Sequence, residues 1–192
     1  MKNNTLKILK QLIKKPSFTI KEALELGVSG QSLAYYAKKG ELERIAPGIY
    51  SFPDDDELDP RWSDLIRIVV SVPNSVVCLI SALEIYELTD EIPREIWIAI
   101  PHKMRAPEIP NCRFVRMRNF KLGITSQLIS GVEIPIFDIE RTIVDSFRYL
   151  DKEVAIKALK TISKRGMNIK KISFYAKELR VNISPFLLMV TT

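Results

Sequence analysis

The chain has 192 residues, of which 46% are hydrophobic and 27% charged, with two cysteines and one histidine. This composition is typical of a soluble globular protein with one large or two small domains, and it excludes intrinsic disorder, collagen-like repeats and coiled coils. Two cysteines and one histidine are too few for a disulfide scaffold or a four-ligand zinc site, so we expect no metal and no other cofactor. The sequence shows neither a signal-peptide core nor an apolar run of about 20 residues, which predicts a cytoplasmic protein that contacts no membrane.

The formal net charge of +6 is divided unevenly along the chain. Residues 1–50 carry +5, residues 51–150 carry −5 and residues 151–192 carry +6. Positive charge concentrated in separate segments favours an anionic partner, with nucleic acid the first candidate. A basic surface that is merely solvated explains the charge count equally well.

The N-terminal residues predict two amphipathic helices in succession. Apolar residues at helical spacing predict the first helix over 4–15, and Pro16 ends it. Thr19 and Glu22 have the spacing of a capping box and begin the second helix. Gly27 ends that helix in the position of a left-handed C-cap.

A third helix and a hairpin follow at once. Ser29 is a suitable N-cap for a helix over 30–39. Alternating residues around a Pro-Gly turn then predict strands at 42–45 and 48–52. This order of elements is that of a winged helix-turn-helix, so we assign residues 1–53 to a DNA-binding domain.

The outward face of the third helix predicts the DNA contacts. If the helix packs through Leu33, Tyr36 and Ala37, its outward face contains no acidic residue. Glutamine and serine read base edges, tyrosine binds base edges or phosphate, and lysine binds phosphate. With the capping serine and one arginine of the first wing strand, the candidate DNA-binding residues are Ser29, Gln31, Ser32, Tyr35, Lys38, Lys39 and Arg44. A winged helix that docks another protein instead of DNA is the alternative.

The rest of the chain predicts a linker and a second domain. Residues 54–60 are acidic and proline-bounded, which is typical of a polar linker. Residues 61–192 predict a mixed α/β domain with helices at 60–71, 81–86 and 139–150, strands at 76–79, 96–100, 114–117 and 132–137, and amphipathic helices at 152–164 and 169–180. The predicted fold class is therefore α+β, with an N-terminal winged helix-turn-helix and a mixed α/β C-terminal domain that ends in amphipathic helices.

The strongest sign of catalysis is a group of three carboxylates. Asp138, Glu140 and Asp145 could bind Mg²⁺ for DNA cleavage, which makes a Mg²⁺-dependent nuclease the alternative function. At 3.6 residues per turn, however, the last two lie about 140° apart around the helix axis. Asp138 is also a suitable N-cap, and Asp145 can form an ion pair with Arg141 four residues before it. The lone loop residue His102 has no partner for catalysis, and Cys78 and Cys112 are expected in or near the core. We therefore expect no enzyme and no metal site.

Three segments of the sequence carry a family resemblance: GVSGQSLAYYAKKGELERIAPGIYSFP at 27–53, CLISALEIYELTDEIPREIWIAIP at 78–101 and VEIPIFDIERTIVDSF at 132–147. They resemble the AbiEi-type antitoxins of type IV toxin–antitoxin systems. Each segment alone is a weak signal, because many winged helices share the Gly48-x-Tyr50 hairpin. The three together, in this order, are more specific.

The resemblance implies a two-domain autoregulator of an abortive-infection, phage-defence system. The resemblance implies a repressor whose winged helix binds repeats of double-stranded DNA in its own promoter. The residues that it implies for this contact are Gln31, Ser32, Tyr35, Lys39 and Arg44. The resemblance also implies a C-terminal domain that opposes a nucleotidyltransferase-like toxin without a stable complex. The sequence leaves open whether the basic C-terminal helices contact DNA, the toxin or RNA.

Overall fold

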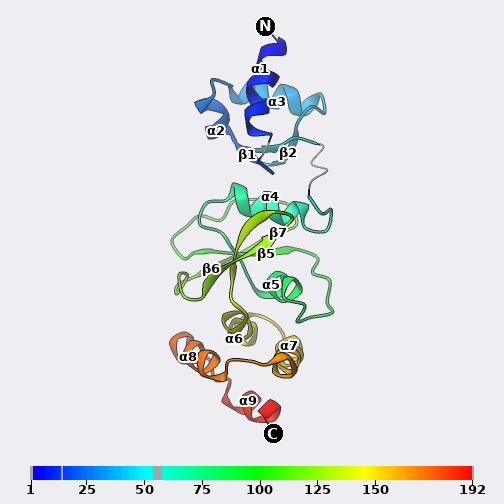
Figure 1. Cartoon of the computed structure of the whole chain (residues 1–192). Helices are drawn as coiled ribbons and strands as arrows, with labels where there is room; N and C mark the ends of the chain where they lie inside the picture. The colour runs from blue at the N-terminus through cyan, green and yellow to red at the C-terminus, as the bar shows by residue number, and fades with distance from the viewer. Residues whose placement is uncertain (1, 14, 54–57, 192) are drawn as a thin grey trace. The chain divides into compact units, whose positions relative to one another are not determined.

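The computed structural model describes residues 2–13, 15–53 and 58–191, and Figure 1 shows the order of the elements. By contacts between residues, the chain forms two units. The first unit comprises residues 1–73, 107–110 and 128–134, and the second comprises residues 74–106, 111–127 and 135–192. The predicted domain boundaries after residue 53 and before residue 61 stay a prediction. Residues 54–57 of the predicted acidic linker lie outside the described residues.

The first unit contains three helices and a hairpin at the predicted places, and one strand that was not predicted. Its elements are α1 (Lys2–Leu9), η1 (Lys10–Leu12), β1 (Phe18–Thr19), α2 (Ile20–Glu25), α3 (Gly30–Lys38), β2 (Glu43–Ala46), β3 (Ile49–Ser51) and α4 (Ser63–Ser71). The first helix differs from its predicted bounds of 4–15, because it is α-helical only from Lys2 to Leu9 and continues as a 3-10 helix to Leu12. The strand order is β1-β3-β2, with both pairs antiparallel. The unpredicted strand β1 therefore joins the segment between α1 and α2 to the wing.

A small hydrophobic core holds the winged helix together. Leu9 from α1, Phe18 from β1, Leu33 from α3 and Tyr50 from β3 are buried in one cluster. The predicted capping box at the start of α2 is confirmed, since Thr19 Oγ1 accepts from the Glu22 backbone N–H while the Glu22 carboxylate accepts from the Thr19 backbone N–H. Local capping and non-local packing thus favour the same arrangement.

Helix α4 belongs by its contacts to the first unit. Ser17 Oγ donates a hydrogen bond to the Arg67 carbonyl oxygen over 2.8 Å. The Arg67 guanidinium forms an ion pair of 3.1 Å with Glu43 on β2. Both bonds join α4 to residues of the winged helix.

The second unit contains most of a five-stranded mixed sheet. Its strands are β4 (Val76–Val77), β5 (Ile96–Pro101), β6 (Cys112–Met117), β7 (Ile124–Ile129) and β8 (Val132–Phe137), in the order β6-β5-β4-β8-β7. The short strand β4 is antiparallel to β5 and parallel to β8, while β5 and β6 are parallel. The predicted strands are confirmed, and β7 was not predicted.

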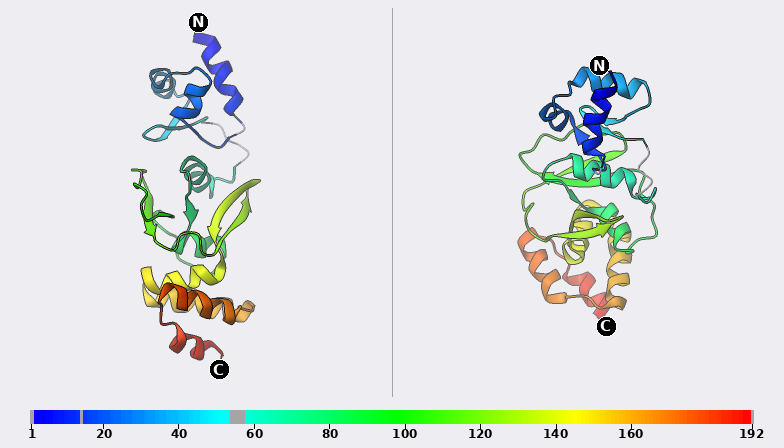
Figure 2. Two further views of the ribbon diagram at one scale, coloured as in Figure 1. Left: turned by 90° about the vertical axis from the view of Figure 1, so that its left-hand side faces the viewer. Right: turned by 45° about the horizontal axis from the view of Figure 1, so that its top comes forward.

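Helices pack on this sheet and on one another. They are α5 (Leu79–Ile85), α6 (Ile139–Tyr149), α7 (Lys152–Arg165), α8 (Ile169–Leu179) and α9 (Ser184–Thr191). Helix α6 contacts α5, α7 and α8, and α7 contacts α9. Figure 2 shows α6 between the sheet and the more C-terminal helices. The apolar faces of these helices form one cluster that includes Leu83, Ile143, Leu159 and Ile172.

The two cysteines lie where the sequence predicts them. Cys78 is fully buried and Cys112 is half-buried. Burial raises the pKa of the Cys112 thiol to about 12 and the pKa of the Cys78 thiol well above its ordinary value.

Among the described residues, no helix combines the length and hydrophobicity needed to cross a membrane.

Candidate nucleic-acid interface

The connection between α2 and α3 forms the helix-turn-helix. Helix α2 ends at Glu25, and its C-cap Leu26 is followed by Gly27, whose φ of +80° requires the left-handed region that glycine adopts readily. The Val28 backbone N–H then donates to the Ala23 carbonyl oxygen over 2.9 Å. Ser29 begins α3 as predicted, because its Oγ accepts from the Ser32 backbone N–H.

Helix α3 has one buried face and one exposed face. Leu33 and Tyr36 are buried in the core of the winged helix, as predicted, and Ala37 is half-buried. The opposite face contains no acidic residue and consists of polar and basic side chains that are exposed, with Ser32 half-buried among them: Gln31, Ser32, Tyr35, Lys38 and Lys39. A duplex could therefore approach this face without meeting a carboxylate of α3 itself.

Tyr35 and Lys39 form a local pair on the exposed face. The Lys39 Nζ atom lies 5.0 Å from the centre of the Tyr35 ring, and Tyr35 is 38% exposed as a residue. The hydrogen bond with Tyr35 and the nearby charge of Glu41 raise the pKa of Lys39. Lysine is already charged at neutral pH at its ordinary pKa, so Lys39 presents a cation, as a phosphate contact requires.

The remaining candidates differ in how free their side chains are. Arg44 is exposed on β2, the first strand of the wing, opposite Tyr50 of β3. The Ser29 hydroxyl lies 3.1 Å from Ser32 Oγ and caps the helix. The structure thus gives both serines a local role at the start of α3, and a DNA role for all seven candidates stays a prediction.

The carboxylates of the alternative metal site are bound by cations instead. Asp138 caps α6 by accepting from the Arg141 backbone N–H. Lys171 of α8 forms ion pairs with Asp138 over 3.2 Å and with Glu140 over 3.1 Å. Tyr175 Oη donates to Asp138 over 2.7 Å, and burial together with this bond raises the pKa of Tyr175 to about 12. These contacts join α6 to α8.

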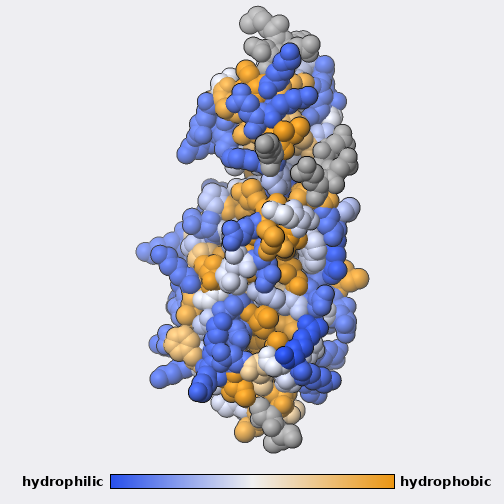
Figure 3. Space-filling model, viewed as in Figure 1, coloured by the Kyte–Doolittle hydropathy of each residue, from blue (hydrophilic) through white to orange (hydrophobic). Residues whose placement is uncertain are grey.

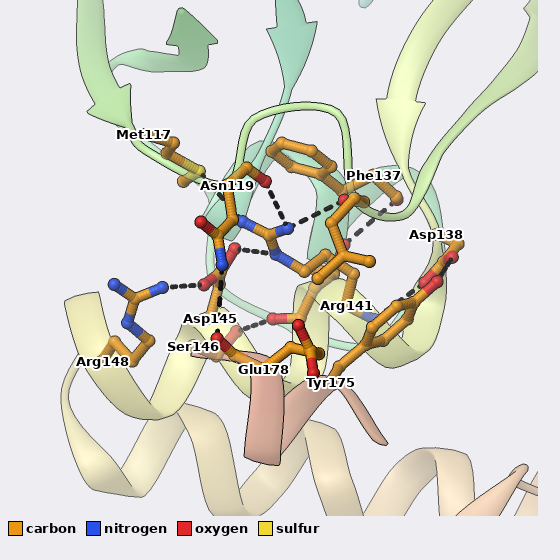
Figure 4. A network of polar contacts seen from close by, with 12 residues as sticks. Met117, Asn119, Phe137, Asp138, Arg141, Asp145, Ser146, Arg148, Tyr175 and Glu178 are labelled. Carbon is orange, nitrogen blue, oxygen red and sulfur yellow. Dashed lines mark hydrogen bonds and ion pairs between the residues drawn. The ribbon is translucent and has the colours of Figure 1, made fainter. Parts of the chain in front are cut away.

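The third carboxylate, Asp145, lies in a buried arginine network (Figure 4). Its two oxygens accept from Arg141 Nε over 2.6 Å and from Arg148 Nη1 over 2.9 Å. Arg141 also donates to the carbonyl oxygens of Asn119 and Leu122. The predicted pair of Arg141 and Asp145 is confirmed, and both side chains are only 1% exposed. Among residues 2–13, 15–53 and 58–191, no three His, Cys, Asp or Glu side chains lie close enough together to hold a metal ion.

The basic C-terminal segment lies on α7 and α8. Hydrophilic side chains gather over these two helices on the face that Figure 3 shows.

The single histidine, His102, is exposed after β5, as the sequence predicts.

Comparison with known proteins gives a family match for an N-terminal segment and a similar fold for most of the chain. Residues 8–53 match the family model described as "Transcriptional regulator, AbiEi antitoxin". The fold is similar to that of the RV2827C protein from Mycobacterium tuberculosis, with a TM-score of 0.63 and 13% identity over 88% of this chain and 70% of that chain. At this identity the likeness shows the fold alone. No curated protein sequence matches the chain.

The family match includes α2, α3 and the wing. It confirms the resemblance that the sequence predicts for the N-terminal segment, while the resemblance of residues 78–101 and 132–147 stays a prediction. Residues 8–53 of this chain are therefore similar to the AbiEi antitoxin family of transcriptional regulators.

Proposed function

We propose that the protein represses its own promoter through the winged helix and acts as the antitoxin of a type IV, abortive-infection system. The observation that carries the proposal is the exposed, acid-free face of α3 inside the segment that matches the family of regulators. Gln31 is suited to read base edges in the major groove of double-stranded DNA, and Lys38 and Lys39 are suited to bind the flanking phosphates. Arg44 extends this basic surface onto the wing.

The proposal distinguishes residues that give affinity from residues that give sequence preference. Each phosphate contact releases counterions, so the slope of log K against log salt concentration changes by about 0.9 per contact. Replacing both Lys38 and Lys39 by Ala should therefore weaken binding to every duplex and reduce the slope by about 2. Gln31→Ala should reduce the preference for the operator by about 1–3 kcal/mol and leave the slope unchanged.

The measurement is fluorescence anisotropy with a duplex from the region upstream of the gene and a scrambled duplex of equal length. The control variant replaces Arg94 and Arg105, which are exposed in the second unit, with Ala and removes the same charge. It should bind both duplexes as the unchanged chain does. Absence of binding at low salt, or an equal loss in the control variant, would refute repression through α3.

The antitoxin role has a separate test in cells. The functional partner proposed here is a nucleotidyltransferase-like toxin encoded beside this gene. Co-expression of this chain should restore growth to cells that produce the toxin, and the two proteins should elute separately in size-exclusion chromatography. The variant without Lys38 and Lys39 should still restore growth, because neutralisation is assigned to residues outside α3. Continued growth arrest with the unchanged chain would disprove the antitoxin role and leave repression standing.

A further inference from the structure

A pocket of about 500 Å³ lies in the second unit, where the ends of β6, α6 and α8 meet. This volume is within the range of small-molecule sites. Its lining includes Arg116 and Arg118 from the end of β6, Arg148 from the end of α6 and Arg180 after α8, with the buried Arg141 among them. Glu178 is the only acidic residue in the lining. The pocket therefore has a strong excess of positive charge.

The cations of this pocket are all of one type. Five of the twelve arginines in the chain line it, and no lysine that the structure describes does. A solvated basic face would contain both residue types, as α7 does. Arginine is the side chain whose planar guanidinium binds the oxygens of phosphate in a bidentate manner. The selection of arginine thus indicates a phosphate-bearing ligand.

Three of these arginines are available to a ligand. Arg141 and Arg148 share the buried carboxylate of Asp145, as Figure 4 shows. In contrast, Arg116, Arg118 and Arg180 are exposed, and their side chains form no ion pair with any residue that the structure describes. The pocket therefore contains three arginines without an ion pair to a described residue and two arginines that are paired with Asp145.

The surrounding backbone fixes the positions of the pocket walls. Asn119 Nδ2 donates to the Glu178 carbonyl oxygen over 3.2 Å, which joins the end of β6 to the end of α8. Arg180 has a φ of +56°, at a C-cap position where glycine is usual. A non-glycine residue in this region carries backbone strain, which is more common at functional sites.

One aromatic ring in the pocket suits a nucleobase. Tyr149 lines the pocket and is 37% exposed. The Arg148 guanidinium lies over the ring, 4.9 Å from its centre, so a base would stack on the opposite face. Bases stack on exposed tyrosine rings in many nucleic-acid sites, with little dependence on sequence. We propose that this pocket binds a nucleotide, with its phosphates on Arg116, Arg118 and Arg180 and its base on Tyr149. The nucleotide is either free or the terminal residue of a single strand, and this site is separate from the proposed DNA surface of α3.

The test is isothermal titration calorimetry on the full chain. The probes are the four ribonucleoside triphosphates, tripolyphosphate without a base, and a single-stranded tetranucleotide with a 5′-phosphate. Arg116→Ala and Arg118→Ala should each weaken nucleotide binding by about 10–100-fold, as loss of a charged hydrogen bond does. Tyr149→Ala should weaken binding of nucleotides but not of tripolyphosphate. Stronger binding of the triphosphates or of the tetranucleotide identifies the source of the nucleotide.

Two controls separate this site from other basic surfaces. Arg94→Ala removes one exposed arginine of the same unit outside the pocket, and it should leave nucleotide binding unchanged. The variant that lacks Lys38 and Lys39 should also bind nucleotide normally, even if it loses duplex DNA. Absence of binding by every probe, equal affinity for nucleotides and tripolyphosphate, or an equal loss in Arg94→Ala would overturn the assignment. Thermal unfolding of each variant checks that the second unit remains folded.

Discussion

Arg141 is the largest fully buried side chain among the described residues, and its charge is neutralised by Asp145. A buried ion pair adds little stability by itself, because both charges lose their hydration. Removal of only one partner is different, because it leaves the other charge buried and uncompensated. The pair therefore makes the second unit sensitive to a change that preserves side-chain volume.

We expect Asp145→Asn to lower the free energy of unfolding by about 3–5 kcal/mol. The matched control is Glu153→Gln in α7, which breaks an i,i+4 pair whose side chains are 79% and 63% exposed. This control should cost less than about 0.5 kcal/mol, since water screens the pair. Urea denaturation followed by circular dichroism measures both, and similar midpoints for the two variants would contradict the account.

The sequence could predict this pair but not its burial. The spacing of Arg141 and Asp145 indicates an i,i+4 contact on any helix. The burial depends on carbonyl oxygens of Asn119 and Leu122, which lie 22 and 19 residues earlier in the chain. Similarly, the basic alternation of β6 is visible in the sequence, but its meeting with Arg148 and Arg180 requires the fold. Local spacing does not reveal contacts that come from the packing of distant elements.

At the scale of elements, the start of α2 depends on one carboxylate. Glu22 accepts hydrogen bonds from the Thr19 backbone and from Lys15. Although burial opposes the charge, the bonds from Lys15 and Thr19 together lower the pKa of Glu22 below its ordinary value. A lowered pKa in the folded state means that ionised Glu22 stabilises the fold above its unfolded pKa, and this contribution disappears as the pH falls through the folded pKa.

Glu22→Gln should therefore lower the stability of the winged helix by about 0.5–2 kcal/mol at pH 7, in the range of lost caps. The difference from the unchanged chain should shrink as the pH falls from 5 to 3. Glu25→Gln, at the exposed C-terminal end of the same helix, should have almost no effect at either pH. Denaturant titrations at pH 7 and pH 3 measure these differences, and a difference that does not depend on pH would be evidence against the capping role.

Elements with local signals were predictable, whereas strands β1 and β7 and the C-terminal helix α9 were not. Strong helical periodicity and caps predict α2, α3 and α6 to within about two residues. Strand β1 has only two residues, so it cannot show alternation, and it is defined by its pairing with β3. Strand β7 is exposed along most of its length at the edge of the sheet, so it lacks the pattern of one buried face. The predicted strand at 76–79 is shortened because α5 begins at Leu79.

At the scale of the whole molecule, each unit has a hydrophobic cluster of its own. Units with separate cores commonly unfold in separate transitions. We expect scanning calorimetry to resolve two transitions, one lowered by Glu22→Gln and the other by Asp145→Asn. The double variant should show both shifts, added within about 0.5 kcal/mol. A single transition that both substitutions shift equally would mean that the chain unfolds as one cooperative body.

The raised pKa values of both thiols have a practical consequence for attaching a fluorophore to α3. Thiolate is the reactive form of cysteine, and a pKa of about 12 leaves Cys112 almost entirely protonated at neutral pH, as burial also does for Cys78. Maleimide dyes will therefore react slowly with the native chain. Ala34 is exposed on α3, and Ala34→Cys would introduce a thiol that reacts far faster than either native one. A single fluorophore could thus be attached beside the proposed recognition surface without removing any cysteine.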